Sequence, residues 1–309
     1  MIYTVTLNPS IDYLVTVDDF HFGATNRADE QHIVPGGKGI NVSKVLASFG
    51  LPSRLFGFTA GFTGDFIESE LKTQGLRTDF IRVNGTTRIN VKLKTDTETE
   101  INGRSPVVEE KHLQQLAGQI ASLSEGDTLV LSGSLPKSLP ADTYRKLTEE
   151  ASRNSIRTVV DTSGAPLRES LYAAPFLIKP NIAELEALYE EKAENEQDVI
   201  RLAEKAVEEG AEHVLVSRGG DPALLVTKNN VYTASVPSGE VRNSVGAGDS
   251  MVAGFLYGLE QQHDIKKAFQ YSIAFGSATA FSLNFAEKES MEKLLPAIHI
   301  THEKKGEVT

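Results

Sequence analysis

The sequence contains no cysteine and no tryptophan. Without cysteine, the chain can form no disulfide bond, no thiolate-bound iron–sulfur cluster or zinc site, and no thiol nucleophile. It also lacks any run of the roughly 18 apolar residues that a membrane-spanning helix needs. The first residues, MIYTVTLNPSIDY, contain no basic segment followed by an apolar core, as a secretory signal would. We therefore expect a cytoplasmic protein without a membrane partner.

Positively charged residues are in the minority. The 31 Lys and Arg residues are outnumbered by 42 Asp and Glu residues, which gives a formal net charge of −11. Nucleic acids repel such a protein, so they are not expected partners. The 309 residues, of which 40% are hydrophobic, are enough for a sizeable core. Because no linker, repeat or low-complexity tract divides the chain, we expect residues 1–309 to form a single domain.

Short runs rich in β-branched residues alternate with helical stretches, which is typical of βαβ units on a mostly parallel sheet. The predicted strands are 3–7, 128–131, 157–160, 176–178 and 213–216. The predicted helices are about 41–50, 64–75, 110–122, 140–153, 196–209, 247–262 and 266–282. Polar, turn-forming segments follow each strand. In an open parallel sheet the ligand crevice lies outside the carboxyl ends of the strands, so these segments either meet at one site or are ordinary turns.

Residues 86–101 interrupt this pattern with a strict alternation of polar and apolar side chains. A period of two is typical of a strand with one polar and one apolar face. The polar face would carry Arg88, Asn90, Lys92 and Lys94. With a turn near Asp96, and with residues 11–20 and 31–35, the pattern predicts a small antiparallel flap on the main sheet. The alternative is an edge hairpin whose polar face is solvated.

The segment Gly246-Ala247-Gly248-Asp249 precedes a strongly apolar helical stretch. Small residues let backbone N–H groups approach an anion closely, and a helix N-terminus carries positive partial charge. The segment therefore predicts a socket for a phosphoryl group. Asp249 would accept a proton from the hydroxyl that attacks phosphorus, for which an ordinary pKa near 4 suffices. The alternative is that Asp249 only caps the helix.

A second cluster, Gly36-Gly37-Lys38-Gly39-Ile40-Asn41, fits neither a Walker loop nor the dinucleotide fingerprint. Its glycines expose bare backbone to a small polar ligand, Lys38 supplies a point charge and Asn41 both donates and accepts hydrogen bonds. A tight turn with a solvated lysine is the alternative. A third segment places Glu184 three residues after Asn181, which fits a helix-capping box as well as a pair of magnesium or phosphate ligands.

With these segments placed, the chain resembles ribokinase-type sugar kinases of the phosphofructokinase-B family. The resemblance rests on five segments in the family's order: TLNPSID (6–12), GGKGINV (36–42), SGSLP (132–136), KPNIAE (179–184) and VGAGDS (245–250). Within the family, the segments TRINVKL (87–93) and GAGDSMV (246–252) are most similar to bacterial 1-phosphofructokinases.

The resemblance implies an α/β fold, a ribokinase-like three-layer αβα sandwich with a mostly parallel central sheet. A small antiparallel β lid would be formed by about 11–35 and 86–106, and in this family the lid often also forms a homodimer interface. The implied reaction is ATP-dependent phosphorylation of the C6 hydroxyl of fructose 1-phosphate to fructose 1,6-bisphosphate. The runner-up is tagatose-6-phosphate kinase, and a non-catalytic sugar-phosphate sensor is a third hypothesis.

The resemblance also implies roles for individual residues. Asp249 would be the base, with Gly246, Ala247 and Gly248 as the anion hole. Asp12, Gly37 and Asn41 would hold sugar hydroxyls, while Lys38 and Arg88 would bind the phosphate already on the substrate. Asn181 and Glu184 would position Mg²⁺ and the ATP phosphates, with Glu184 reaching the metal through water. The nucleotide would be flanked by Ser217, Arg218, Gly219, Gly220, Gly248 and the helix around Ser277.

Overall fold

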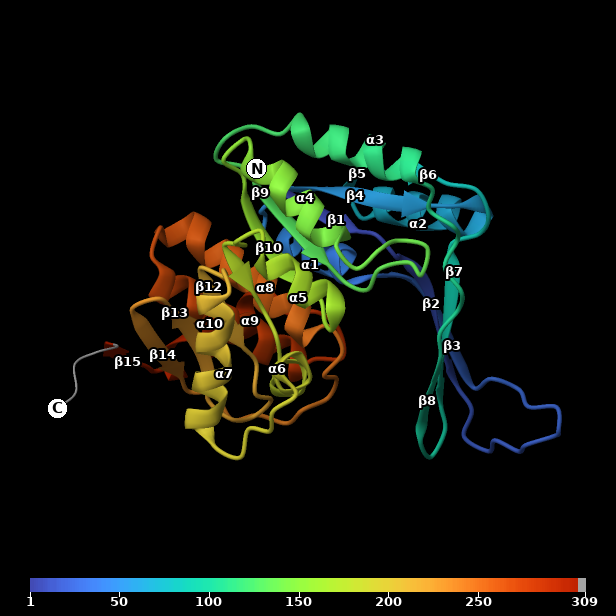
Figure 1. Ribbon diagram of the computed structural model, residues 1–309. Coiled ribbons are helices and arrows are strands. Elements are labelled where there is room, and N and C mark those ends of the chain that lie inside the picture. Colours follow the sequence, from blue (N-terminus) through green and yellow to red (C-terminus); the bar gives the residue numbers. More distant parts are fainter. Residues whose placement is uncertain (305–309) are drawn as a thin grey trace.

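The computed structural model describes residues 1–304 and consists of a large sheet covered by helices and a smaller sheet that projects from it (Figure 1). The large sheet has the order β15-β14-β13-β12-β11-β10-β9-β1-β4-β5, and β6 also pairs with β4. Its strands are β1 (Ile2–Thr6), β4 (Ser53–Thr59), β5 (Arg77–Thr78), β6 (Ile81–Arg82), β9 (Thr128–Ser132), β10 (Arg157–Asp161), β11 (Leu177–Ile178), β12 (His213–Val216), β13 (Ala223–Thr227), β14 (Asn230–Ala234) and β15 (Ile300–Lys304).

The large sheet is parallel from β12 to β5, and β13, β14 and β15 continue it in antiparallel fashion. Helices cover both faces, as a buried parallel sheet requires. They are α1 (Lys38–Ser48), α2 (Gly61–Thr73), α3 (Glu110–Ala121), α4 (Thr143–Ser152), α5 (Ala165–Leu171), α6 (Ile182–Tyr189), α7 (Glu196–Glu208), α8 (Ala247–Gln262), α9 (Ile265–Ala280) and α10 (Lys288–Leu294), which the short 3₁₀ turn Leu295–Ala297 follows. Across residues 1–304, no helix combines the length and apolar character that crossing a membrane requires.

The core is divided between the two faces of the sheet. Leu129 and Leu131 pack with α3, α4, α5, α6 and α7 on one face. Val130, between them in the same strand, packs with α1, α8, α9 and α10 on the other. Successive side chains of β9 point to opposite faces of the sheet, so one strand contributes to the apolar layer on each face. The predicted three-layer αβα class is confirmed.

Strand β4 is absent from the prediction because Gly57 interrupts its apolar pattern. A Cβ atom on Gly57 would lie 2.0 Å from the carbonyl oxygen of Thr6, so only glycine fits beside β1. The residue that weakens the sequence signal is therefore the one that lets the two strands pair.

The smaller sheet, the lid, has the order β3-β2-β7-β8. Its strands are β2 (Ser10–Thr16), β3 (Glu30–Gly36), β7 (Arg88–Lys94) and β8 (Glu98–Ile101). The pairs β2–β3 and β7–β8 are antiparallel as predicted, but the prediction is wrong for the central pair, because β2 and β7 run parallel. Both strands begin where strands of the large sheet end, β2 after β1 and β7 after β6. Because β1 and β6 end on the same side of that sheet, β2 and β7 extend away from it in one direction (Figure 1).

Candidate active site

A cavity of about 570 Å³ lies where the carboxyl ends of the parallel strands meet the lid. The polar segments that follow the predicted strands do converge here, as expected. They contribute Asn8, Ser132, Gly133, Ser134, Thr162, Ser163, Lys179, Asn181 and Ser217 to its wall. From β7 the lid contributes Arg88, Asn90 and Lys92, of which Asn90 is buried, whereas Lys94 at the end of the strand is exposed. Most of this face is therefore not simply solvated.

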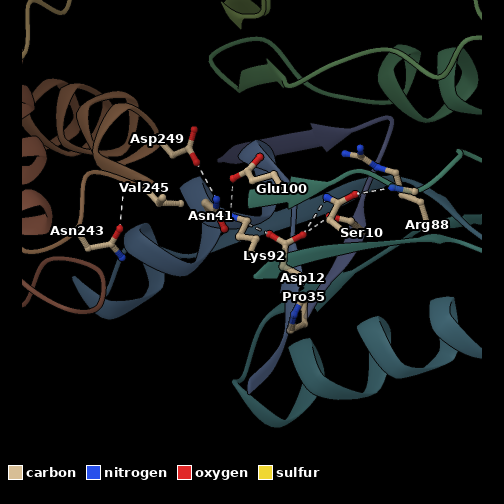
Figure 2. Close-up of polar contacts among 12 residues, drawn as sticks. Ser10, Asp12, Pro35, Asn41, Arg88, Lys92, Glu100, Asn243, Val245 and Asp249 are labelled. Carbon is tan, nitrogen blue, oxygen red and sulfur yellow. Dashed lines mark hydrogen bonds and ion pairs between the residues drawn. The ribbon is translucent and has the colours of Figure 1, made fainter. Parts of the chain in front are cut away.

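The N-terminus of α8 opens onto this cavity through Gly246, Gly248 and Asp249. Gly246 is the N-cap and has a left-handed backbone (φ 80°), which favours glycine. Asn243 holds the preceding loop, since its Oδ1 accepts the Val245 N–H at 3.0 Å (Figure 2). Because the first amides of a helix have no partner within it, those of Gly248 and Asp249 can serve an anion.

Asp249 is buried at the cavity wall, with 6% of its surface exposed. Its Oδ2 accepts a hydrogen bond of 2.7 Å from the Asn41 Nδ2 (Figure 2). The N-cap residue of α8 is Gly246, and the Asp249 carboxylate binds Asn41 rather than a helix N–H, so Asp249 does not cap the helix. Burial, and then repulsion by Asp161, raise the pKa of Asp249 to about 6, against the attraction of Lys38 and the Asn41 hydrogen bond. The ordinary value near 4 expected from the sequence is therefore too low.

Lys38 is half-buried and ion-paired rather than freely solvated. Its ammonium lies 3.1 Å from Oδ1 of Asp161, a carboxylate with 0% exposure at the end of β10. Lys179, at the end of β11, lies 3.5 Å from the same oxygen. Burial lowers the pKa of Lys38, but attraction by Asp161 and Asp249 outweighs it and raises the pKa above its ordinary value. The lysine is therefore charged and lies at the part of the cavity where Asp249 attracts it.

Asp12 is at the centre of a polar cluster on the lid (Figure 2). Its Oδ1 accepts hydrogen bonds from Ser10 Oγ at 2.7 Å and from Asn90 Nδ2 at 3.1 Å, and Lys92 Nζ lies 3.6 Å from its Oδ2. A Cβ atom on Gly36 would lie 2.5 Å from the Asp12 carboxyl carbon, so glycine there leaves room for this carboxylate. Asp12 is held facing the cavity in a fixed orientation.

Arg88 also lies on the lid wall, where its guanidinium donates to the Asn8 carbonyl from Nε at 3.3 Å and from Nη2 at 3.0 Å. The prediction joins Arg88 and Lys38 on one substrate phosphate, but the two side chains have different partners in the structure. Lys38 forms an ion pair with Asp161 and is attracted electrostatically by Asp249. Arg88 instead donates hydrogen bonds to the loop after β1.

Asn181 and Glu184 form the capping box of α6 and also line the cavity. The Asn181 N–H donates to Glu184 Oε2 at 2.9 Å, and the Glu184 N–H donates to Asn181 Oδ1 at 2.8 Å. The capping and ligand interpretations are thus compatible. Residues 1–304 contain no group of three or more side chains that could hold a metal alone. Hard oxygen donors beside a phosphate site nevertheless suit Mg²⁺, which usually keeps waters and phosphate oxygens as ligands.

The residues predicted to flank the nucleotide are dispersed. Ser217 lines the cavity, and the backbone at Gly219 and Gly220 has open space around it. The Arg218 guanidinium instead binds Glu196 and the Pro222 carbonyl. Ser277 is buried in α9, and Ala247 and Gly37 complete the two glycine segments at the starts of α8 and α1.

Several polar residues of the wall are absent from the predicted site, among them Asn8, Lys92 and Lys179. The fully buried Asp161, which pairs with Lys38 and Lys179 behind that wall, is absent as well. Asp161 and Lys179 each end or directly follow a predicted strand. Their position in the chain was a usable signal, because strand ends of a parallel sheet meet at one edge.

A family model described as pfkB family carbohydrate kinase matches residues 5–290. The chain belongs to this family. It is 48% identical to a 1-phosphofructokinase of Bacillus subtilis, over 97% of this chain and 99% of the relative. A D-tagatose-1-phosphate kinase of Bacillus licheniformis is 37% identical over 98% of this chain and 100% of the relative. A tagatose-6-phosphate kinase of Staphylococcus epidermidis is 35% identical over 91% and 92%.

Solved structures agree with this family membership. The crystal structure of phosphofructokinase-2 from Escherichia coli in complex with fructose-6-phosphate has a TM-score of 0.88 and 28% identity, covering 96% of this chain and 98% of that chain. The resemblance to phosphofructokinase-B sugar kinases is therefore confirmed.

Proposed function

We propose that this chain is an ATP-dependent 1-phosphofructokinase that phosphorylates the C6 hydroxyl of fructose 1-phosphate. The observation that carries the proposal is the buried Asp249 carboxylate, set beside the N-terminal amides of α8 and across the cavity from the polar face of the lid. The 48% identity to a 1-phosphofructokinase, against 37% and 35% for the tagatose-phosphate kinases, favours fructose 1-phosphate as substrate.

The reaction follows from the chemistry of Asp249. The substrate O6 attacks the γ-phosphorus of ATP, the O6–P bond forms, the bond to the β-phosphate oxygen breaks, and the O6 proton passes to the carboxylate. ADP and fructose 1,6-bisphosphate leave. A carboxylate with a pKa of about 6 is mostly ionised at neutral pH and is a stronger base than an ordinary aspartate. Of the segment Gly246-Ala247-Gly248, the amides of Gly246 and Gly248 would stabilise the charge on the phosphoryl oxygens together with that of Asp249, whereas the Ala247 N–H donates to the Ser244 carbonyl at 3.3 Å.

The sugar would lie between the lid and α1. Asp12, Gly37 and Asn41 would bind its hydroxyls, and Arg88 would bind the phosphate it already carries. The ion pair of Lys38 with Asp161 and its attraction to Asp249 support a role for Lys38 at the reacting end rather than on that phosphate.

The nucleotide phosphates would extend from Gly248 toward α6. There Asn181 and Glu184 would hold Mg²⁺, Glu184 through water, and the bound ion would neutralise charge on the ATP phosphates. Ser217, Arg218, Gly219 and Gly220 would form the loop on one side of the nucleotide, and the helix around Ser277 would form the other. Because ATP and sugar phosphates are cytoplasmic metabolites, we assign the enzyme to the cytoplasm.

A homodimer through the lid is part of this proposal. Strand pairing puts Ile33, Ile89 and Ile101 on the lid face that points away from the cavity, where they are 52%, 41% and 60% exposed. Large apolar side chains gathered on a projecting sheet favour burial against a second copy of the same surface.

A comparison of substrates tests the proposed activity. ADP release is coupled to a detector enzyme with fructose 1-phosphate, tagatose 1-phosphate and tagatose 6-phosphate as acceptors. We expect the highest kcat/KM with fructose 1-phosphate. A higher value with either tagatose phosphate would reassign the substrate. The absence of ADP release with every sugar phosphate would instead favour a sensor without catalytic activity.

A further inference from the structure

We propose that Asn8 is a positioning residue, which fastens the lid to the large sheet and holds Arg88 at the place where the substrate phosphate would bind. The inference rests on the proposed function, which gives Arg88 that role, and adds a residue that acts through it. Asn8 lies in the short connection 7–9 between β1 of the large sheet and β2 of the lid. It lines the cavity and has 9% of its surface exposed.

The first argument is the side-chain amide of Asn8, which joins segments from both sheets. Its Nδ2 donates a hydrogen bond of 3.1 Å to Ser134 Oγ, in the segment that follows β9 of the large sheet. Its Oδ1 accepts a hydrogen bond of 2.7 Å from Ser105 Oγ, in the segment that follows β8 of the lid. Because the amide is largely shielded from water, these bonds hold the two segments and the main chain of Asn8 together.

The second argument is the main-chain carbonyl of Asn8. It accepts hydrogen bonds from Arg88 Nε at 3.3 Å and from Arg88 Nη2 at 3.0 Å. A guanidinium is planar and carries its N–H donors in a rigid fork, so two contacts to one oxygen fix its plane and leave the other donors for an anion. The position of this carbonyl therefore sets the direction in which Arg88 faces the cavity.

The third argument is that the segment with Ser105 also packs on β7, the strand that begins at Arg88. The Gly103 N–H donates to Asn90 Oδ1 at 3.2 Å. A Cβ atom on Gly103 would lie 2.4 Å from the Ile89 carbonyl oxygen, so this segment lies directly against the start of β7. The bond between Ser105 and the loop after β1 thus closes a ring of contacts around the start of this strand.

Two other roles for Asn8 make different predictions. An asparagine that only stabilises the fold would lower the melting temperature when replaced and leave KM unchanged. An asparagine that binds the substrate directly would affect KM whether or not Arg88 is present. Only a residue that acts by positioning Arg88 loses its effect on KM once the guanidinium has been removed.

The test is a double-mutant cycle on the full chain, with Asn8→Ala, Arg88→Met and the combination of both. We expect Asn8→Ala to raise KM for fructose 1-phosphate by about tenfold and to change kcat by less than about threefold, because phosphate binding common to ground state and transition state is weakened. In the Arg88→Met background, the same substitution should raise KM by less than about twofold. A KM in Asn8→Ala within about twofold of the wild type, or an equal increase in both backgrounds, would overturn the proposal.

Asn154→Ala is the matched control. The Asn154 Nδ2 also ties two elements together, because it donates from the end of α4 to the carbonyls of Ala121 at 2.8 Å and Leu123 at 3.4 Å after α3. Of residues 1–304, neither Asn154 nor Ser105 belongs to the cavity wall. Asn154→Ala should therefore lower the melting temperature and leave KM unchanged.

Ser105→Ala separates positioning from direct binding. It removes one of the two side-chain hydrogen bonds of Asn8 without changing the cavity wall. We expect KM to rise about threefold, less than in Asn8→Ala, because the bond to Ser134 remains. An unchanged KM in Ser105→Ala beside a raised KM in Asn8→Ala would make Asn8 a direct ligand and refute the positioning role.

Hydrogen exchange keeps this inference separate from the proposed activity. If the wild-type chain phosphorylates no sugar phosphate, the proposed function fails, yet the fastening of the lid can still be measured in the chain without substrate. Asn8→Ala should speed amide exchange in β7 about tenfold, and Asn154→Ala should not, because only the former removes the two side-chain hydrogen bonds that fasten the lid. An unchanged exchange rate in β7 of Asn8→Ala would overturn the fastening.

Discussion

The pH dependence of the reaction gives a quantitative test of how Asp249 is tuned. A base must be ionised to accept a proton, so activity should fall as the pH drops through the pKa of Asp249, about 6. Below that pH, kcat/KM should fall about tenfold per unit. The Asn41 Nδ2 donates to the ionised carboxylate at 2.7 Å and so lowers this pKa. Removing that donor with Asn41→Ala should raise the pKa further and move the acid limb to higher pH.

The size of the shift follows from the hydrogen bond. A hydrogen bond to a charged group contributes about 1.5–3 kcal/mol, and about 1.4 kcal/mol corresponds to one pKa unit. Water entering the space left by the amide would replace part of the interaction, so we expect a shift of about one unit. At pH 6, the wild type would then keep about half of its plateau value and the variant about a tenth.

The assay is kcat/KM for fructose 1-phosphate between pH 5 and 9, in buffers of constant ionic strength. A phosphate ester also titrates near pH 6, but the substrates are the same for both proteins, so the difference between their curves isolates the enzyme. Asn90→Ala removes an amide that binds Asp12 rather than Asp249, and should change the height of the curve without moving its limb. Coincident limbs for wild type and Asn41→Ala, or a shift to lower pH, would refute the reasoning.

Three further predictions concern the socket, the cost of the buried base and the lid. Gly248→Ala should lower kcat by about tenfold to a hundredfold, since its Cβ would meet a lysine ammonium at 3.1 Å; Gly118→Ala, whose Cβ meets nothing within 4 Å inside a helix, should instead stabilise the fold by about 0.5–1 kcal/mol. Asp249→Asn should raise thermal stability at pH 8 by up to about 3 kcal/mol but by less than about 1 kcal/mol at pH 4. The reason is that burial raises the pKa of Asp249, so its ionisation in the folded state becomes costly only above the unfolded value of 3.8 and reaches its full cost above about 6. Equal melting temperatures of the two proteins at pH 8 would contradict this. Ile89→Lys should reduce the light-scattering mass from twice to once the chain mass of 33.6 kDa, while Val34→Lys on the opposite lid face should not; a wild type that is monomeric at micromolar concentration would remove the dimer from the proposal.

The helices, and the convergence of polar segments at the carboxyl ends of the strands, can be predicted from local sequence signals. The bounds of α8 agree with the predicted 247–262 because a left-handed glycine starts it and a continuous apolar pattern sustains it. Strand pairing is harder to predict from the sequence. The strands β2 and β7 lie more than 70 residues apart, and no local pattern determines whether they run parallel or antiparallel. Gly57 shows the same limit, because its small size serves a neighbour on another strand.

Within the site, local signals indicate which groups face the ligand but not how each is tuned. The socket around Gly246 is visible in the sequence because bare backbone before a carboxylate is an unusual pattern. The pKa of Asp249 is not, because it depends on burial and on Asp161, and on an Asn41 that lies 208 positions away along the chain. The pairing of Lys38 and Lys179 with one buried oxygen likewise arises only when two strand ends and a helix start come together.

Single-turnover phosphoryl transfer in Asp249→Asn is the most direct test of the central claim that this carboxylate activates the C6 hydroxyl. ATP is mixed with excess enzyme and fructose 1-phosphate, quenched at successive times, and the product is identified by phosphorus NMR. The wild type should form fructose 1,6-bisphosphate, and the variant should form it about 10²–10⁴ times more slowly with sugar-phosphate binding retained. Transfer at the wild-type rate in the variant, or a phosphate on a hydroxyl other than C6, would contradict the account.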